Sequence, residues 1–399
     1  MGKHLVLAGG GHAHLTTISA IRSLINRGHD VTVIAPSDFH YYSGMAPGML
    51  SGTYRPQEIR FNIRKLTTGR GGQFIRGMVI RVNADQSEVV LEDGQRIAYD
   101  VVSFNVGSVI PPARPVIHGG SVYTVKPVDR VLEGRAAILD LWNQSESATP
   151  VDLNVVGGGP AGVEMAGALW RLTTDEGITC RITLITGGNL LEPFSQRLRT
   201  KVSKSLSKRG IRIREMSRVL SIEPSHIVLE DKSTVPSDIT FVATGVIPSR
   251  LFMESRLPTA EDGGLLVNDY LQSLEYPRIF GGGDCITIRG RNLARVGVYA
   301  VRQNPLLLHN LSAALENKPL KKFNPGNPDF LLILNLGDST AVFKKGEWIW
   351  KGALAFRLKD FIDRRFMRKF QLSGELNEPL NGEPVKPLSG ELTENIDSG

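Results

Sequence analysis

The chain repeats one pattern of hydrophobic and polar positions twice. An apolar run at residues 4–8 leads into a glycine-rich turn, a helical segment that ends near Arg27 and Gly28, and a second apolar run at residues 30–34. Such a unit of about 30 residues is the size of a βαβ mononucleotide-binding half. The pattern restarts at Val151, with residues 180–185 as the next strand. The sequence therefore predicts two nucleotide-binding α/β units.

Both turns resemble the phosphate-binding fingerprint GxGxxG, and each lies between a predicted strand and a predicted helix. In the second copy, LNVVGGGPAGVEMAG, Gly157 makes the tight turn, Gly159 admits a pyrophosphate and Gly162 lets the helix pack on the strand. In the first copy, LVLAGGGHAHL, Gly9 and Gly11 take the first two roles, whereas His14 occupies the packing position. We expect nucleotide binding to survive this exchange.

Between and after the two units, the pattern is more varied. Residues 73–96 read as hairpin strands, and the segment IPPARP at residues 110–115 predicts a crossing between domains. Gly281-Gly-Gly-Asp284 follows another short apolar run. Its aspartate is expected either to accept hydrogen bonds from the polyol hydroxyls of a flavin or to be the N-cap of a following helix. Beyond Pro319 we expect a small sheet and then a basic helix over residues 348–370.

Composition narrows the class of protein. The 399 residues carry a net charge of +7, yet the segment after Leu372 holds six acidic residues against Lys386 alone, so the body is strongly basic. A basic body suits anionic small molecules or an anionic membrane, and without interleaved aromatic residues we expect no nucleic-acid partner. The two cysteines, Cys180 and Cys285, and the histidines form no metal-ligand pattern, so we expect no metal site.

Several motifs together resemble the two-dinucleotide-binding flavoproteins of the pyridine nucleotide-disulfide oxidoreductase fold. Within them the chain is similar to type II NADH:quinone dehydrogenases and, more closely, to FAD-binding proteins associated with selenophosphate synthetase. The residues that carry this likeness are the altered first turn GGGHAHL, YSGMAPG at 42–48, VYAVRQ at 298–303 and LKDFIDRRFM at 358–367. The resemblance covers residues 1–372 and implies FAD in the first cradle and NAD(P)H, as co-substrate, in the second.

The expected fold class is α/β, with two Rossmann-like dinucleotide-binding domains, the FAD domain being interrupted by the NAD(P)H domain, and a small C-terminal α+β region. The predicted bounds are 1–112 and 244–320 for the FAD domain, 113–243 for the NAD(P)H domain, 321–372 for the C-terminal sheet and helix, and 373–399 for a disordered acidic tail in which SGELNE recurs as SGELTE.

Candidate site residues follow from the turns and the resemblance. Glu164 is expected near the nicotinamide or as a proton relay, with an ordinary first-turn helix carboxylate as the alternative. Lys126 is expected beside the flavin or in solvent, and Tyr299, Arg302 and Gln303 along the acceptor pocket or on a packed helix. The predicted cofactor-binding residues are Gly9, Gly11, His12, Ala13, Ser37, Ser43, Pro47, Val79, Gly107 and Asp284 for FAD, and Gly157, Gly159, Pro160, Ala161, Gly162, Thr186 and Gly245 for NAD(P)H.

Both strands that normally end in a ribose-binding acid lack one. Ala35 and Thr186 stand at those places, and Ser37 is expected to bind the FAD ribose instead. Without a carboxylate at the second site, NADH and NADPH stay equally open. Sulfide:quinone reductases need a cysteine pair beside the flavin, and only Cys285 lies near it here, so disulfide exchange is disfavoured.

The function we expect is transfer of hydride from NAD(P)H to FAD and then of electrons to a quinone or another small acceptor. Residues 348–371 combine basic residues, tryptophans and an apolar stripe, which favours a helix on an anionic membrane, with docking on the protein itself as the alternative. We therefore expect a cytoplasmic protein peripheral to the inner face of the membrane. A reductase linked to selenium or sulfur metabolism, a low-turnover flavin redox sensor, and a homodimer are left open.

Overall fold

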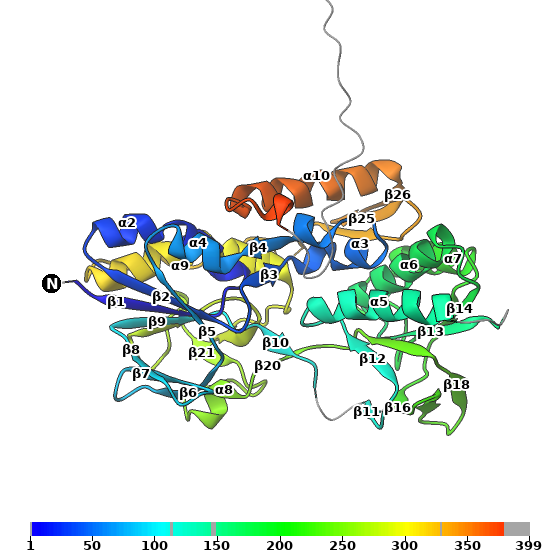
Figure 1. Cartoon of the computed structure of the whole chain (residues 1–399), viewed down its shortest axis with the longest axis horizontal. Coiled ribbons are helices and arrows are strands. Elements are labelled where there is room, and N and C mark those ends of the chain that lie inside the picture. The colour runs from blue at the N-terminus through cyan, green and yellow to red at the C-terminus, as the bar shows by residue number, and fades with distance from the viewer. Residues whose placement is uncertain (1, 112–114, 145–148, 328, 379–399) are drawn as a thin grey trace, which may run out of the picture.

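The computed structural model describes residues 2–111, 115–144, 149–327 and 329–378, and two five-stranded parallel sheets organise the chain (Figure 1). Neighbouring strands run parallel throughout both sheets. The first sheet, in order, is β22 (Ile279–Gly281), β9 (Val101–Phe104), β1 (His4–Ala8), β2 (Asp30–Ala35) and β5 (Gln73–Arg76); the second is β12 (Ser121–Thr124), β19 (Ile239–Val242), β13 (Val151–Val156), β14 (Cys180–Ile185) and β15 (Arg212–Arg214).

The first sheet is completed only after the chain has built the second. Its edge strand β22 follows every strand of the second sheet in sequence, so the second domain is an insertion in the first. The two crossings between domains pair with each other, since β10 (Ser108–Val109) runs antiparallel to β20 (Ile247–Pro248). The predicted fold class, an α/β protein with one Rossmann-like domain interrupted by another, is confirmed.

Both domains have the same layers (Figure 1). Helices cover one face of each parallel sheet and a small, mostly antiparallel sheet covers the other, so the parallel strands are buried on both sides and read as continuous apolar runs. The helices are α1 (Leu15–Ser19), α2 (Ile21–Asn26), α4 (Ile63–Thr68) and α9 (Gly297–Leu315) on the first domain and α5 (Asp129–Gln144), α6 (Pro160–Asp175) and α7 (Gln196–Ser207) on the second; the small sheets are β6 (Val79–Asn83), β7 (Glu88–Leu91) and β8 (Arg96–Ala98), and β11 (Val116–Ile117), β16 (Val219–Ile222), β17 (His226–Leu229) and β18 (Thr234–Pro236).

Several short elements complete the two domains. A segment of the first domain reaches the second through α3 (Ala46–Leu50), which contacts α5 and α6. The others are η1 (His12–His14), β3 (Phe39–Tyr41), η2 (Ser43–Met45), η3 (Pro56–Ile59), β4 (Arg60–Asn62), α8 (Leu251–Glu254), β21 (Leu265–Val267), η4 (Gly283–Cys285) and β23 (Ile286–Ile288).

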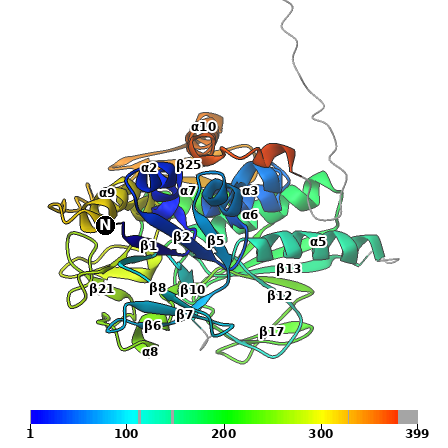
Figure 2. The ribbon, with the colours of Figure 1, turned by 60° about the vertical axis from the view of Figure 1, so that its left-hand side comes forward.

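The C-terminal region is a three-stranded antiparallel sheet followed by a long helix. Strands β24 (Leu332–Asn335), β25 (Ala341–Lys345) and β26 (Trp348–Gly352) lead into α10 (Ala353–Phe370). In both views α10 lies across the helical layer of the molecule, over elements of both domains (Figures 1 and 2). Among the described residues, no helix has the length and apolar character needed to cross a bilayer.

The first six residues of the predicted acidic tail do not behave as expected. Residues 373–378 pack on β4 and α4, and Glu375, within η5 (Glu375–Asn377), is 1% exposed. They are ordered because their carboxylates meet buried donors there. The rest of the predicted tail, residues 379–399, lies outside the described residues.

Candidate functional site

The first glycine turn is held by the side chain of Asn105, which follows β9. A Cβ on Gly9 would lie 2.2 Å from the Asn105 carbonyl oxygen, and one on Gly11 would lie 2.2 Å from Asn105 Oδ1, so only glycine fits at either position. The amide of Asn105 accepts from the Ala13 backbone N–H at 3.1 Å and donates to the Gly282 carbonyl at 2.6 Å. One side chain thus joins the first turn to the loop that carries Asp284.

His14 takes the place of the third glycine by making two hydrogen bonds of its own. Burial lowers its pKa to about 4, so the ring is neutral near pH 7. Its Nδ1 lies 2.6 Å from the Gly9 carbonyl oxygen, which only accepts, and its Nε2 lies 2.8 Å from Ser103 Oγ. Nδ1–H therefore donates to Gly9, and Nε2 accepts from the serine hydroxyl.

This exchange changes the local backbone. In the second copy a Cβ on Gly162 would lie 1.8 Å from the Gly157 carbonyl oxygen, and α6 runs unbroken from Pro160. In the first copy the histidine is accommodated by a 3₁₀ turn, η1, and the helix behind it is divided at Ala20 into α1 and α2. The altered turn is therefore followed by a 3₁₀ turn and two short helices, where the second turn is followed by one long helix.

A group of aromatic rings closes the first turn on the side of α10. His40 Nε2 lies 3.1 Å from His12 Nδ1, and the His12 ring also contacts Tyr42 and Phe366. Burial, followed by the charge of Lys126, lowers the His12 pKa to about 4. The other nitrogen of His12, Nε2, is buried and has no hydrogen-bond partner among the described residues. A bound group with a polar atom at this point would satisfy it, which fits a dinucleotide cradle.

The aspartate of the GGGD loop is paired with a predicted catalytic residue. Lys126 Nζ lies 2.6 Å from Asp284 Oδ2, and Ser108 Oγ donates to the same oxygen at 2.9 Å. The alternative of a helix N-cap is wrong, because the segment after Cys285 is the strand β23 and not a helix. The lysine, whose side chain is 31% exposed, is therefore paired, and it neutralises a carboxylate that is 12% exposed.

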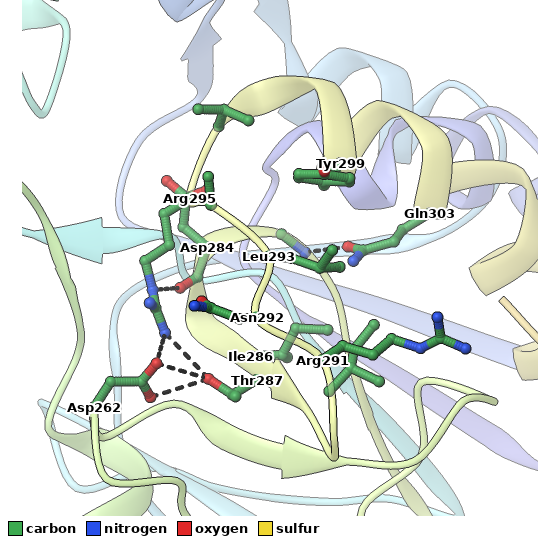
Figure 3. A pocket seen from close by; sticks show the side chains of 14 residues that line it. Asp262, Asp284, Ile286, Thr287, Arg291, Asn292, Leu293, Arg295, Tyr299 and Gln303 are labelled. Atoms are coloured by element: carbon green, nitrogen blue, oxygen red, sulfur yellow. Dashed lines mark hydrogen bonds and ion pairs between the residues drawn. The ribbon is translucent and has the colours of Figure 1, made fainter. Parts of the chain in front are cut away.

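Two residues of α9 line a small cavity beside this pair (Figure 3). Gln303 accepts from the Gly283 backbone N–H at 2.6 Å, and buried Tyr299 stands one turn earlier on the helix. The cavity has a volume of about 50 Å³. Arg302 does not line it, and its guanidinium donates to the carbonyl oxygens of Pro325 and Asn327, in keeping with the packed-helix alternative.

The second cradle opens on a larger cavity of about 250 Å³. Gly159 faces space with no atom within 4 Å of an added Cβ, and Pro160 opens α6. Thr186, at the position of the missing acid, is buried behind the turn and does not line the cavity. The lining is instead glycine-rich and carries one cation; it consists of Pro115, Val156, Gly157, Ile185, Gly187, Gly188, Arg218, Val219 and Thr244.

A largely buried charge cluster joins both domains to α10. Lys359 Nζ donates to Asp363 Oδ2 and to the Gly44 carbonyl oxygen, each at 2.8 Å, and the Tyr42 hydroxyl donates to Asp363 Oδ1 at 3.0 Å. Glu164, on α6, accepts from the Asn335 backbone N–H at 2.8 Å. We call Tyr42, Glu164, Lys359 and Asp363 the α10 cluster.

In the α10 cluster, the carboxyl groups of Glu164 and Asp363 are shielded from water and lie near one cation, Lys359. Burial raises the pKa of Glu164, while the charge of Lys359 and the Asn335 N–H oppose the rise. Burial likewise raises the pKa of Asp363, against the same lysine. The surrounding carboxylates raise the pKa of Lys359 despite its burial. Glu164 is thus not an ordinary solvated helix carboxylate.

The remaining predicted cofactor residues lie at places of several kinds. Ser37 is exposed after β2 and accepts from the Phe39 N–H at 3.2 Å. Ser43 begins η2, Pro47 is buried in α3 and Val79 is buried in β6. Gly107, at a φ of +73°, and Gly245 face open space, and Ala161 is exposed on the first turn of α6.

Sequence reasoning missed four residues that the structure places at these sites. Asn105 and Arg218 belong to no motif identified in the sequence, and Lys359 and Asp363 enter only as members of the basic helix and of LKDFIDRRFM, without a site role of their own. The spacing of Lys359 and Asp363, one helical turn apart on the face away from the leucines, is the one signal that marks them for burial.

Two glycine-rich cradles at two parallel sheets, with one domain inserted in the other, define a two-dinucleotide-binding oxidoreductase. The chain belongs to the pyridine nucleotide-disulphide oxidoreductase family, whose profile matches residues 3–305. The predicted enzyme class, an FAD-dependent oxidoreductase that uses NAD(P)H, is confirmed with it.

Relatives and solved structures agree with this assignment. Ferroptosis suppressor protein 1 of Xenopus tropicalis is 26% identical over 354 residues, 85% of this chain and 88% of that one. The type II NADH:quinone oxidoreductase of Haemophilus influenzae is 22% identical over 402 residues, with 88% and 90% covered. The sulfide:quinone oxidoreductase structure of Aquifex aeolicus superposes with a TM-score of 0.75 at 19% identity, covering 93% of this chain and 92% of that one.

Proposed function

We propose that the protein oxidises NAD(P)H and reduces a quinone at a membrane face. The observation that carries this proposal is the α10 cluster, in which a partly accessible acid, Glu164, a cation and a tyrosine meet under a helix that joins both domains. Two of the relatives named above are quinone reductases by name. FAD, when bound, would accept hydride from the nicotinamide and pass electrons to the acceptor.

The residues of this chain supply what a quinone needs besides electrons. Quinone reduction consumes protons, and a buried carboxyl with a raised pKa holds a proton closer to neutral pH than a solvated one. Glu164 is the acid that we assign to this role, at its carboxyl oxygens. Lys359 opposes the rise that burial causes in the pKa of Asp363, and the Tyr42 hydroxyl, whose pKa burial and Asp363 raise, stays protonated as a donor.

The membrane contact that we propose is the outer face of α10, which carries several exposed apolar side chains. Its aspartates and Lys359 face the protein, where Asp360 accepts from the Tyr54 hydroxyl at 2.8 Å. Met367 and Phe370 pack into the core, whereas other apolar side chains face solvent: Leu354 is 68% exposed, Phe361 54% and Ile362 39%, and Trp348 on the preceding strand is 77% exposed. Exposed Arg357, Arg365, Arg368 and Lys369 flank them, which suits an anionic membrane surface.

For the second cradle we propose a preference for NADPH. The acid that would bind a ribose 2′-hydroxyl, and repel a 2′-phosphate, is replaced by a buried threonine, whereas Arg218 lines the cavity. Its guanidinium is 3.7 Å from Glu230 and 58% exposed, so it is placed to reach a bound phosphate.

Disulfide chemistry does not fit these residues in spite of the family's name. Both cysteines are free, Cys180 on a strand of the second domain and Cys285 beside the first sheet. Burial raises the pKa of Cys285 to about 12, so its thiol is not a nucleophile near neutral pH.

The experiment that tests the function follows the flavin absorbance of the purified protein. NADPH should bleach the flavin bands, and a short-chain quinone should restore them. If bleaching occurs but a panel of soluble acceptors restores the bands faster than any quinone, the quinone assignment fails and a reductase for a soluble acceptor replaces it. Absence of bleaching by either nucleotide would instead favour a sensor with little turnover.

A further inference from the structure

The acidic end of the chain carries one short motif twice. Residues 372–378 read LSGELNE and residues 388–394 read LSGELTE, identical at six of seven positions. The structure describes the first copy and shows it docked on β4 and α4. The docking surface explains most of what the two copies share.

The first glutamate of the motif fills a buried site. Glu375 Oε1 accepts from the backbone N–H of Asn62 at 3.1 Å, and Oε2 accepts from the N–H of Ser373 at 2.9 Å. The side chain between these donors is almost fully buried, so another residue type would leave them without a partner. The copy at 388–394 has the same residue at Glu391.

The second glutamate neutralises a buried arginine. Glu378 lies 2.6 Å from Lys65 Nζ and 3.5 Å from the guanidinium of Arg60, and it accepts from Asn62 Nδ2 at 2.7 Å. Arg60 is 4% exposed and stacks on the ring of Phe39, so its charge needs a carboxylate nearby. In the second copy, Glu394 stands at this position.

The glycine of the motif and its one variable position also agree with this mode of docking. Gly374 has a φ of +79°, a conformation that favours glycine. The second copy has a glycine, Gly390, at the same position of the motif. The one position that differs, Asn377 against Thr393, is exposed in the docked copy. The two leucines of the docked copy are exposed as well, and nothing in the structure explains why they recur.

Gln57 completes the surface, since its Nε2 donates to the Glu378 carbonyl oxygen at 3.3 Å. We propose that the surface formed by Gln57, Arg60, Asn62 and Lys65 is a binding site for acidic peptides of the form LSGELxE, and that the second copy of the motif exchanges with the first in this site. The described residues offer one such surface per chain and the sequence offers two motifs, so one motif is always in excess. Both copies are tethered to the same chain, which gives each a high effective concentration at the site.

The tether also decides which copy prevails. Binding of the second copy closes a loop that is 16 residues longer, and this lowers its occupancy by a factor on the order of 10 to 100 relative to the first. The first copy is therefore the one that is docked in the structure. The second becomes the main occupant only when the first is displaced or altered.

The test uses four full-length variants and hydrogen exchange at the Asn62 amide, which donates to Glu375. They are Glu375→Ala/Glu378→Ala, Glu391→Ala/Glu394→Ala, all four substitutions together, and Glu383→Ala/Asp397→Ala as a control that removes equal charge outside both motifs. We expect the control and the second-copy variant to keep wild-type protection. The first-copy variant should stay roughly tenfold better protected than the fourfold variant.

A second measurement shows that the fourfold variant retains the site. A labelled synthetic peptide, acetyl-LSGELTE-amide, should bind the fourfold variant at least about tenfold more tightly than wild type, where the tethered copy competes. Equal protection in the first-copy and fourfold variants would overturn exchange between the copies. Failure of the peptide to bind the fourfold variant would overturn the binding site itself, and neither result bears on quinone reduction.

Discussion

The hydroxyl of Tyr42 lies 3.0 Å from Oδ1 of Asp363, although 321 positions separate the two residues in sequence. Tyr42 begins the segment YSGMAPG and Asp363 lies within LKDFIDRRFM, two stretches that carry the family resemblance. Their contact shows that the C-terminal helix is part of the site and not an appendage. Since Lys359 bonds both Asp363 and the backbone of Gly44, this contact is the place at which substitutions should separate the two half-reactions.

Replacement of Lys359 by methionine should slow reoxidation of the flavin by quinone and leave its bleaching by NADPH unchanged. The substitution leaves Asp363 and Glu164 without their buried cation, which costs about 3 kcal/mol or more of stability and favours the protonated acids. We expect quinone reoxidation to fall roughly tenfold, as for a lost charge-assisted interaction. Stopped-flow measurement of each half-reaction tests this, with Lys345→Met, an exposed lysine on β25, as the control. Equal slowing of both half-reactions would contradict the assignment.

The acid assigned to proton delivery should appear in the pH dependence of quinone reoxidation. Burial raises the pKa of Glu164, so the protonated form persists above the usual carboxyl range, and the rate should fall as pH rises through this raised pKa. Glu164→Gln should remove that limb of the profile while the variant still folds. A profile that is the same in both proteins would show that the proton comes from elsewhere.

Nucleotide preference should depend on Arg218. We expect Arg218→Ala to raise KM for NADPH roughly tenfold, the effect of losing one hydrogen bond to a charged group, and to leave KM for NADH almost unchanged. Steady-state kinetics with both nucleotides and a saturating quinone measure this. Arg212, an exposed arginine on β15, gives the matched control as Arg212→Ala. A parallel rise in both KM values would place Arg218 outside the phosphate subsite.

The parts of this protein that sequence predicted are those in which local pattern dictates structure. Parallel strands such as β1 and β13 read as apolar runs because they are buried on both faces, and glycine turns follow from backbone sterics. The α10 cluster was missed because Lys359 and Asp363 look like solvated helix residues until the tertiary contact with Tyr42 is known. Arg302 is a converse case, since its neighbours Tyr299 and Gln303 line the small cavity while its guanidinium bonds a later loop.

The histidine in the first turn should make the protein sensitive to acid. The pKa of His14 falls from the unperturbed value of 6.5 to about 4 on folding, so the unfolded chain binds more protons between these values. Its stabilising contribution is present above pH 6.5 and is lost as pH falls towards 4. We expect the thermal midpoint of the wild type to drop over this window, and that of His14→Gln to drop less. An identical decline in both proteins would refute the assignment.

The exposed face of α10 should decide whether the protein binds membranes. Replacing Leu354, Phe361 and Ile362 by serine removes the apolar contact without touching the inward face that bonds Tyr42 and Tyr54. Flotation with vesicles rich in anionic lipid should recover the wild type and lose most of the variant, because each buried side chain contributes about 1.5–3 kcal/mol to insertion. Reduction of a short-chain quinone, which reaches the site from water, should be retained by the variant, and reduction of a long-chain quinone in the vesicles should fall. If the variant floats as well as the wild type, α10 does not bind the membrane, and its exposed apolar face is a contact for a protein partner instead.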